Sequence, residues 1–598
     1  MTWPILGITL FLPLLGSAVL ALIPASRTMA VRTVGIAFAA ATFALSLVML
    51  VSFYATPKVG SAVLGGSVHG RSLAHVASPI TFQFQEQLSW LGSTRALGQF
   101  RQALNQGNNG VNQAFAPPIN FSFHIGVDGL AVWMVALTGL LFLLAAVALS
   151  RREDRPRSFL ILMGLAETGV IGVLVSLDLV LFYFFWEAAL IPLYFQLLGW
   201  GGPRRGAAAL KFIIYTVAGS LFMLLAILGL YFITGAETGV YTFDVPTQIA
   251  MATQVIGQHP TSLTIFGHVF TFLTPEQWLF LAFALAFAIK VPLVPFHTWL
   301  PDAYGSGTTP FLIFFAGIVS KLGAFGLIRY NLALFPQASH FFQPVMLALG
   351  VTSILYGGLM ALGQRDIRQI VAYSSISHLG FVVLGIFALN VDGLGGAIVQ
   401  MVNHGIIVAG LFLCVGMLEV RFGTRDLGRM GGLARPMPIM AGMFLVLVLA
   451  GMGMPLMNSF VGEFLILLGV FQVSPAWAVA ASLGVVIACW YMLRLYQGLT
   501  QGAVRIPGTG GEERRAGGSV SGGGVRDLRA LEIALLAPLV AVCIGVGIYP
   551  SPIISTIRFN ASQYMRLDGR GPQALMPTLG LGVASSSAPQ PPGGGSAP

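Results

Sequence analysis

Residues 276–330 read EQWLFLAFALAFAIKVPLVPFHTWLPDAYGSGTTPFLIFFAGIVSKLGAFGLIRY. Lys290 and Lys321 each lie near the middle of an apolar run that is long enough to cross a bilayer. A charge at that depth costs roughly 2.5–3.5 kcal/mol on insertion scales, so both lysines are candidate functional residues. Pro292 and Pro295 follow Lys290, and proline removes a backbone donor and breaks or kinks a helix. The stretch therefore predicts two transmembrane helices, one of them broken beside an ion or proton site.

The composition of the whole chain is that of a membrane protein with many spans. Of its 598 residues, 56% are hydrophobic and only 9% are charged, whereas a soluble domain carries about 25% charged residues. Residues 1–23 are apolar but have no basic n-region. We therefore expect a first transmembrane helix there and not a cleaved signal peptide.

Several cofactor and ligand classes are excluded by the motifs. The three cysteines, Cys414, Cys489 and Cys543, lie in separate apolar runs without a CxxC pair, so the chain predicts no iron–sulfur or metal site. The sequence has neither GxGxxG after a strand nor GxxxxGK[ST]. We expect no cofactor in this chain. The net charge of +10 reflects loop arginines that set topology, so we expect no nucleic-acid partner.

Apolar runs of about 20 residues predict fourteen transmembrane spans. They fall near 3–23, 32–54, 129–149, 158–177, 179–199, 210–234, 277–296, 309–330, 343–363, 369–389, 393–418, 437–471, 475–497 and 530–551. The span at 437–471 is unusually long and is interrupted at GMGMPLMNSF.

The distribution of basic residues predicts the orientation. Cytoplasmic loops carry an excess of Lys and Arg, and the odd-numbered loops hold most of them, for example Arg151, Arg152, Arg155, Arg157, Arg421, Arg425, Arg429 and Arg435. With these loops in the cytoplasm of a bacterium, the chain is a multi-pass inner-membrane protein with both termini extracytoplasmic.

The spans and loops divide the chain into eight parts. These are 1–54, the first two transmembrane helices; 55–126, an extracytoplasmic insertion; 127–157, the third helix and a basic cytoplasmic loop; 158–330, a first five-helix repeat; 331–497, a second five-helix repeat; 498–529, a flexible cytoplasmic linker; 530–553, the last helix; and 554–598, an outer tail that is largely disordered. Five is an odd number, so the second repeat enters the membrane from the opposite side. Interrupted helices at matching places in two inverted halves point to a transport site.

Six ionisable residues lie deep in six different spans. They are Glu187, Lys290, Lys321, His378, His404 and Glu463. A proton path needs titratable groups that are desolvated enough for their neighbours to tune them. Of the chain's basic residues only four are lysines, and a buried lysine can release its proton whereas arginine stays charged. The six residues therefore predict a proton relay.

Each of these residues has a plainer interpretation. Glu187 and Lys290 can form a static ion pair between two helices, although buried pairs seldom stabilise relative to apolar packing. The histidines can make interhelical hydrogen bonds, or ligate a haem, but each helix offers only one histidine. Glu463 can cap the second half of its broken helix, where a carboxylate suits the dipole.

Three further residues are possible accessory groups. Glu167 precedes Glu187 by one span and is either a side branch of the relay or a buried carboxylate. His297 and Asp302, in HTWLPDA, lie at the cytoplasmic edge in the predicted topology. They serve either proton uptake or the fixing of a loop.

Several motifs together are similar to the antiporter-like membrane subunits of respiratory complex I, the proton-translocating NADH:quinone oxidoreductase. They are FHIGVDGL, FYFFWEAALIPLYFQLLGWGG, KFIIYTVAGSLFMLLAILGLYF, KVPLVPFHTWLPDA, AYSSISHLGF and FVGEF. The resemblance covers about residues 120–550. A glutamate at Glu463, where the related L and N subunits have lysine, resembles the M type.

The resemblance implies an all-α fold of fourteen transmembrane helices with two inverted five-helix repeats, each with one broken helix. It implies that the six buried residues form the central axis. It also implies that NADH, FMN, iron–sulfur clusters and quinone belong to partner subunits. The partners implied are neighbouring membrane subunits, the peripheral redox arm and membrane lipids.

From this we expect a proton to reach Lys290, which Glu187 keeps charged, and to pass through Lys321, His378 and His404 to Glu463. Two alternatives stay open. The chain can be a subunit of a multi-subunit Na⁺/H⁺ antiporter, or a structural membrane-arm subunit that conducts nothing.

Overall fold

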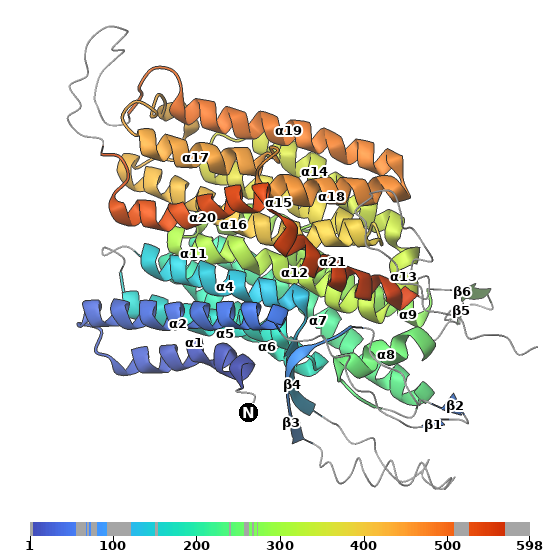
Figure 1. Cartoon of the computed structure of the whole chain (residues 1–598). Coiled ribbons are helices and arrows are strands. Elements are labelled where there is room, and N and C mark those ends of the chain that lie inside the picture. Colours follow the sequence, from blue (N-terminus) through green and yellow to red (C-terminus); the bar gives the residue numbers. More distant parts are fainter. Residues whose placement is uncertain are drawn as a thin grey trace, which may run out of the picture.

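Long apolar helices lying roughly parallel make up most of the molecule (Figure 1). The computed structural model describes residues 4–55, 67–68, 71–72, 80–91, 121–149, 154–238, 241–255, 262–265, 268–271, 273–506 and 526–568. Within these ranges the strands form only three two-stranded sheets. The predicted class, a mostly helical membrane protein, is confirmed.

The helices follow the predicted apolar runs. They are α1 (Ile5–Leu22), α2 (Thr28–Ala55), α4 (Gly129–Ala148), α5 (Pro156–Val175), α6 (Leu179–Trp200), α7 (Arg205–Thr238), α8 (Val245–Val255), α9 (Pro275–Lys290), α10 (Trp299–Ser306), α11 (Thr309–Phe314), α12 (Ser320–Gly326), α13 (Pro336–Phe341), α14 (Gln343–Gly363), α15 (Ile367–Ile386), α16 (Val391–Phe422), α17 (Pro438–Gly451), α18 (Asn458–Val473), α19 (Pro475–Thr500), α20 (Ala530–Ile548) and α21 (Ser551–Met565). Two π-helical segments, η2 (Phe315–Val319) and η3 (Leu327–Leu332), flank α12, and 3-10 turns occur at η4 (Leu427–Arg429) and η5 (Arg566–Asp568).

Among the described residues, twelve helices are long and apolar enough to cross a membrane. Thr309–Leu332 counts as one of them, because α11, η2, α12 and η3 are continuous. Two shorter apolar helices, α17 and α18, belong to one of the interrupted runs, and α9 and α10 belong to the other. The length and hydropathy of these helices are those of an integral membrane protein.

Both interruptions occur where the sequence predicts them. α9 ends at Lys290, directly before Val291 and Pro292, and the chain resumes as α10 at Trp299. α17 ends at Gly451, and α18 begins at Asn458 after a connection in which Gly453 has a φ of +70°. A positive φ suits glycine, which has no Cβ to clash with the backbone.

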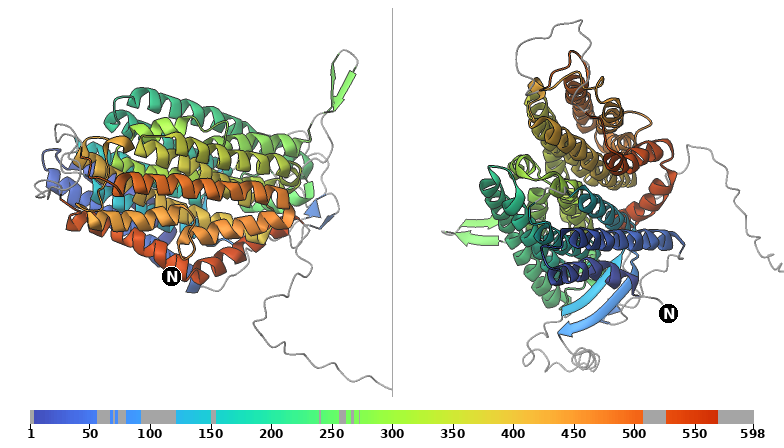
Figure 2. Two further views of the ribbon diagram at one scale, coloured as in Figure 1. Left: turned by 90° about the horizontal axis from the view of Figure 1, so that it is seen from above. Right: turned by 90° about the vertical axis from the view of Figure 1, so that its left-hand side faces the viewer.

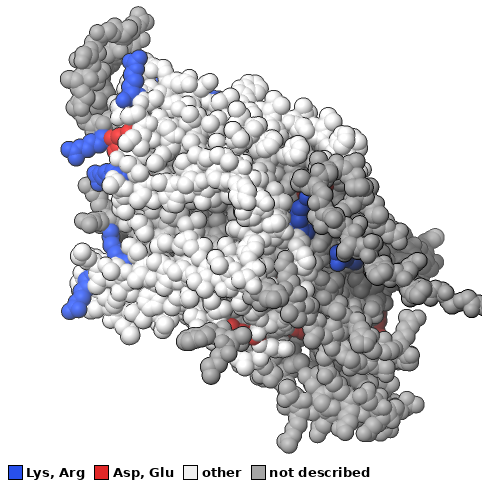
Figure 3. Space-filling view, viewed as in Figure 1, with Lys and Arg blue, Asp and Glu red and all other residues white. Residues whose placement is uncertain are grey.

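The first and second halves of the chain form neighbouring groups of helices. In the view along the helices, the blue-to-green half lies beside the yellow-to-red half (Figure 2). Within the groups, α5 packs against α6, α14 against α15, and α16 against α18. On the face shown in Figure 3 a broad uncharged band covers the helices, and Lys and Arg side chains gather at the end that includes the α1–α2 turn. The bilayer core would occupy this band.

The ends of the helices opposite these basic side chains carry the remaining elements. Strands β3 (Gln83–Leu91) and β4 (Phe121–Val127) pair antiparallel, as do β1 (Ser67–Val68) with β2 (Arg71–Ser72) and β5 (Ser262–Ile265) with β6 (His268–Thr271). The predicted insertion at 55–126 therefore contains strands. Its residues 56–66, 69–70, 73–79 and 92–120 lie outside the described residues.

Two predicted boundaries differ from the structure. The last span ends at Ile548, and the predicted tail from 554 begins inside α21, an amphipathic helix with Ile553 and Ile557 buried on one side. The helix forms because its apolar side packs against α16 and α4. The predicted linker at 498–529 starts later, since α19 runs to Thr500. Residues 507–525 and 569–598 lie outside the described residues.

Candidate functional site

Lys290 lies buried at the first break. It is the last residue of α9, where the negative end of the helix dipole favours a cation. Its ammonium group lies 5.0 Å from the ring centre of Trp186 and 5.8 Å from that of Phe212, and aromatic faces attract cations. The Glu187 carboxylate on α6 is half-buried and within electrostatic range of Lys290. No ion pair of 4 Å or less joins these two described residues, so the predicted Glu187–Lys290 pair stays a prediction.

Lys321 lies in α12 and is completely buried. Its ammonium group donates a hydrogen bond to the Ala316 carbonyl at 2.6 Å. Ala316 belongs to η2, a π-helical segment, and such segments occur frequently at functional sites. Lys321 is therefore held by a polar group of its own helix and has no carboxylate beside it among the contacts of the described residues.

Close backbone approaches bring the lysine helices to each other and to His404. A Cβ atom at Gly323 would lie 2.7 Å from the Phe287 carbonyl oxygen, so α12 packs directly on the last turn of α9. A Cβ atom at Gly405 would lie 2.7 Å from the Gly317 carbonyl oxygen of η2. Glycine is needed at both places because a side chain would separate the helices. His404 consequently lies within electrostatic range of Lys321.

His378, His404 and Glu463 form one buried cluster. The ring centres of the two histidines are 5.6 Å apart. Nδ1 of His378 lies 2.9 Å from Oε1 of Glu463, and the same oxygen accepts hydrogen bonds from Gln400 at 2.9 Å and Ser459 at 3.1 Å. An ionised carboxylate accepts such bonds, and charge-assisted bonds are the strong ones. The cluster is arranged to hold a carboxylate next to a histidine.

The hydrogen bonds define the hydrogen positions on His378. A carboxylate can only accept, so Nδ1 of His378 carries a hydrogen when Glu463 is ionised. Nε2 lies 3.3 Å from the Tyr491 hydroxyl, which then donates to the neutral ring. A further proton can therefore reach His378 only at Nε2, while the Nδ1 hydrogen is aimed at Glu463.

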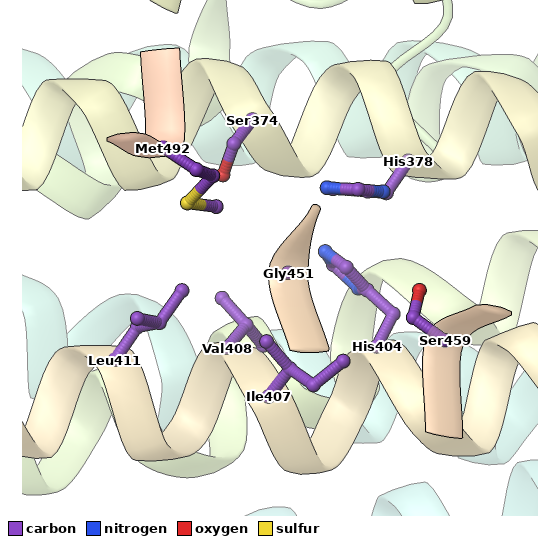
Figure 4. A pocket seen from close by; sticks show the side chains of 9 residues that line it. All are labelled: Ser374, His378, His404, Ile407, Val408, Leu411, Gly451, Ser459 and Met492. Atoms are coloured by element: carbon purple, nitrogen blue, oxygen red, sulfur yellow. The ribbon is translucent and has the colours of Figure 1, made fainter. Parts of the chain in front are cut away.

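A small cavity lies beside the two histidines, and both of them line it (Figure 4). Both imidazoles point into it, together with Ser374 and Ser459, and Met492 closes another side. Its volume is about 10 Å³, which is about the space that one water molecule requires. A single water would fit beside His378 and His404, with polar partners on several sides.

The contacts give an order along the chain of groups. Lys321 is near His404, His404 faces His378, and His378 contacts Glu463. These contacts favour an order with His404 before His378, whereas the sequence predicts His378 first; the order of proton transfer stays a prediction. η2, which precedes Lys321, packs against α16, the helix that carries His404.

Two of the plainer interpretations do not fit this geometry. Haem ligation by His378 requires a free ring nitrogen, but both of its ring nitrogens are engaged by Glu463 and Tyr491. Glu463 is beyond the first turn of α18, which has no acidic residue in its first turn, so Glu463 does not cap that helix.

The three accessory candidates lie in different surroundings. Glu167 on α5 is buried, and its Oε1 has no hydrogen-bond partner among the described residues. His297 is buried in the connection after Lys290, with its ring centre 4.9 Å from that of Tyr356. Asp302 is half-exposed and pairs with Lys211 at 2.8 Å. The structure brings Asp302 to Lys211, and it does not bring Glu167 into the His378–Glu463 cluster.

The sequence reasoning missed an important ion pair. Arg329, near the end of the predicted span at 309–330, is fully buried in η3 and pairs with the fully buried Asp128 at 2.7 Å. The Tyr564 hydroxyl of α21 donates to the other Asp128 oxygen at 2.9 Å. The sequence feature that could have predicted this pair is an arginine inside the apolar run LIRYNLALF. A charge in such a run is usually paired with an opposite charge from another part of the chain.

A search for metal sites gives a negative result within the described ranges. No group of three or more His, Cys, Asp or Glu side chains there could hold a metal ion. The three cysteines are free, and they lie on α16, α19 and α20.

Comparison with known families gives a match over about half of the chain. Residues 176–488 match the family described as NADH:quinone oxidoreductase/Mrp antiporter, transmembrane. This range contains all six predicted axis residues.

Individual relatives are similar over most of their length. NADH-quinone oxidoreductase subunit M of Rickettsia prowazekii is 36% identical over 486 residues, which are 81% of this chain and 87% of that protein. The subunit M of Pseudomonas aeruginosa is 40% identical, over 73% of this chain and 81% of the relative. The subunit M of Escherichia coli K12 is 38% identical, over 81% and 90%.

Solved structures share the fold. A chain of respiratory complex I from Thermus thermophilus with bound NADH has a TM-score of 0.71 and 29% identity, covering 94% of this chain and 100% of that one. A chain of the Mrp complex from Dietzia sp. also has a TM-score of 0.71, at 21% identity, covering 95% and 100%. At 21% identity, the similarity to the Mrp chain concerns the fold alone.

Proposed function

The chain belongs to the NADH:quinone oxidoreductase/Mrp antiporter family of membrane subunits, and from this premise we propose that it is the proton-translocating M subunit of NADH-quinone oxidoreductase, respiratory complex I. Relatives named subunit M align over most of their length. Its neighbours are other membrane subunits of the complex and the peripheral arm. It is a multi-pass protein of the bacterial inner membrane.

The chain contributes to a translocase and carries no redox centre of its own. NADH, FMN, iron–sulfur clusters and quinone belong to the partner subunits. Redox energy must therefore arrive as movement or as a change of charge.

The relay we propose runs through the six buried residues. A proton taken up from the cytoplasm resides on Lys290, whose charge Glu187 and the rings of Trp186 and Phe212 stabilise. Moving Glu187 away weakens that stabilisation and turns Lys290 into a donor. At an effective dielectric constant of 20, a unit charge about 6 Å away contributes roughly 3 kcal/mol.

From Lys290 the proton passes to Lys321, then His404, His378 and Glu463. The single observation that carries this proposal is the contact between Nδ1 of His378 and Oε1 of Glu463 at 2.9 Å, beside a cavity of about 10 Å³ that His404 also lines. A proton added at Nε2 of His378 lets the Nδ1 hydrogen move to Glu463. Glu463 then releases it outward or to a neighbouring subunit.

We further propose that the chain has fourteen spans in two inverted five-helix repeats. The twelve long apolar helices, together with the broken pairs α9/α10 and α17/α18, support that number. The broken pair is the fourth member of each set of five, which is the pattern of an inverted repeat around a transport site. The basic residues of the odd loops support an outward position for both termini.

We propose a division of the chain that follows the one predicted from the sequence. Residues 1–54, 127–157 and 530–553 hold the flanking helices; 158–330 and 331–497 hold the two repeats. The outer insertion is 55–126, the cytoplasmic linker begins after α19 ends at Thr500, and the outer tail contains α21 (Ser551–Met565).

A second candidate, a subunit of a Na⁺/H⁺ antiporter, is favoured by the fold shared with the Mrp complex. Mass spectrometry of the native complex distinguishes the two candidates. Quinone-site and iron–sulfur subunits must copurify with a complex I subunit and must be missing from a Na⁺/H⁺ antiporter.

The test replaces Lys290 by alanine in the assembled complex. Proton pumping in proteoliposomes should be lost, because the stored proton has no carrier. Arg429→Ala is the control, since the Arg429 side chain is 72% exposed and pairs with Asp426 in the loop after α16. Unchanged protons per NADH in Lys290→Ala would reject the proposed role.

A further inference from the structure

The short helix α10 is tied to the site at its first residue. The buried Trp299 indole donates a hydrogen bond to the Ile289 carbonyl at 2.8 Å, next to Lys290. The same indole packs on Phe212, with ring centres 5.4 Å apart. Phe212 is one of the two aromatic faces against which the Lys290 ammonium lies. A shift of α10 must therefore disturb the surroundings of Lys290.

The other end of α10 is held by two arginines from the second half of the chain. Arg368 on α15 donates to the Gly307 carbonyl at 2.5 Å, and Arg425 donates to the Gly305 carbonyl at 2.7 Å. The last carbonyls of a helix have no intrahelical partner, and cations suit that end of the dipole. The arginines thus complete the C-terminus of α10.

Two carboxylates hold the arginines in turn. Arg368 pairs with Glu419 on α16 at 2.6 Å, and Arg425 lies 3.6 Å from Asp366 and 3.9 Å from Glu419. We call these four residues the arginine clamp. Arg368 is nearly fully buried, and a buried charge costs free energy unless it is paired and hydrogen-bonded. Each charged residue of the clamp therefore either contacts the C-terminal end of α10 or pairs with an arginine that does.

We propose that α10 is a strut through which the second half of the chain sets the position of Lys290, with Arg368 and Arg425 as positioning residues. This proposal rests on the proposed function, in that Lys290 must carry the proton. A change at α15 or α16 moves the clamp. α10 passes the displacement to Trp299, and Trp299 passes it to the Ile289 carbonyl and the Phe212 ring.

The experiment compares Arg425→Gln with Arg429→Gln in the purified complex. Arg425 is only 30% exposed and contacts α10, whereas Arg429 in the same loop is 72% exposed and pairs with Asp426. Both substitutions remove one positive charge. Pumping in proteoliposomes should fall about ten-fold in Arg425→Gln, because this variant loses one charge-assisted hydrogen bond. It should stay unchanged in Arg429→Gln. NADH oxidation by an artificial acceptor reports on assembly.

Two further variants distinguish positioning from simple stability. Arg425→Lys, which keeps a cationic donor, should restore most of the pumping. In a Trp299→Phe background, which already breaks the strut at its other end, Arg425→Gln should add no further loss. Pumping of Arg425→Gln equal to that of Arg429→Gln, or additive losses in the double variant, would overturn the strut.

The test of the strut and the test of the proposed function can fail independently of each other. If Lys290→Ala still pumps, the relay itself fails. If Lys290→Ala is inactive while Arg425→Gln pumps normally, the relay stands and only the strut fails. Arg368→Gln serves as a second probe of the clamp in assembled complexes.

Discussion

Replacing Asp128 by asparagine should strongly destabilise the subunit. Asp128 and Arg329 both have 0% side-chain exposure, and their closest atoms are 2.7 Å apart. Asparagine keeps the shape and is as good an N-cap as aspartate, so the bond from the Ala131 amide to residue 128 survives. What disappears is the counter-charge. Nε and Nη1 of Arg329 already lack partners among the described residues.

The magnitude follows from the depth of the pair. Removing one partner of a buried ion pair leaves an uncompensated charge and costs about 3–5 kcal/mol. Asp178→Asn is the matched control, because Asp178 is buried, caps α6 and accepts from Ser122, but has no cation among its hydrogen-bond partners. We expect the control to cost about 1 kcal/mol or less, the range of a neutral hydrogen bond.

The assay is thermal dissociation of the detergent-purified complex, followed by the loss of this subunit. Asp128→Asn should dissociate at a clearly lower temperature than Asp178→Asn. Replacing both partners, Asp128→Leu with Arg329→Met, should recover much of the loss, because apolar residues of similar volume often replace a buried pair without cost. Equal dissociation temperatures for the two single Asn variants would refute the reasoning.

Two predictions concern the cluster around Glu463. Glu463→Gln should assemble, since the amide oxygen can still accept from Gln400 and Ser459, but pumping should be lost because an amide takes up no proton; normal protons per NADH would contradict the relay. Gly451→Ala should slow pumping several-fold, because the new Cβ would lie 2.9 Å from the Met492 methyl group and narrow the cavity beside the histidines. Gly442→Ala on the same helix, with open space at its Cβ, is its control; equal pumping in the two would exclude a role for the cavity.

The sequence was sufficient for the helices and for both breaks. Apolar length and proline act locally, so the positions of Lys290 and of the 452–457 connection could be predicted from neighbouring residues alone. That Glu187 lies within electrostatic range of Lys290 could also be expected, because ionisable residues at membrane depth usually pair with polar groups. Lys321, which donates to a backbone carbonyl, shows that the partner need not be an acid.

Contacts between distant segments could not be predicted in the same way. Arg329 and Asp128 are 201 residues apart, and the order of His404 and His378 depends on which helix faces η2. The α21 helix was missed because its apolar residues are few and its partners, α16 and α4, are distant in sequence. These features depend on packing, which a single sequence without its neighbours does not reveal.

The π-helical turn before Lys321 has a consequence for insertions and deletions. A π turn holds one residue more than an α turn, because its hydrogen bonds span five residues instead of four. Deleting one residue between 315 and 319 could be absorbed by converting η2 to α-helix, so that the segments before and after it keep their relative rotation. Without that conversion, everything beyond the deletion would turn by about 100°. The conversion would move the Ala316 carbonyl out of its contact with Lys321, so a protein of the right length and the right lysine could still lack a correctly held ammonium group.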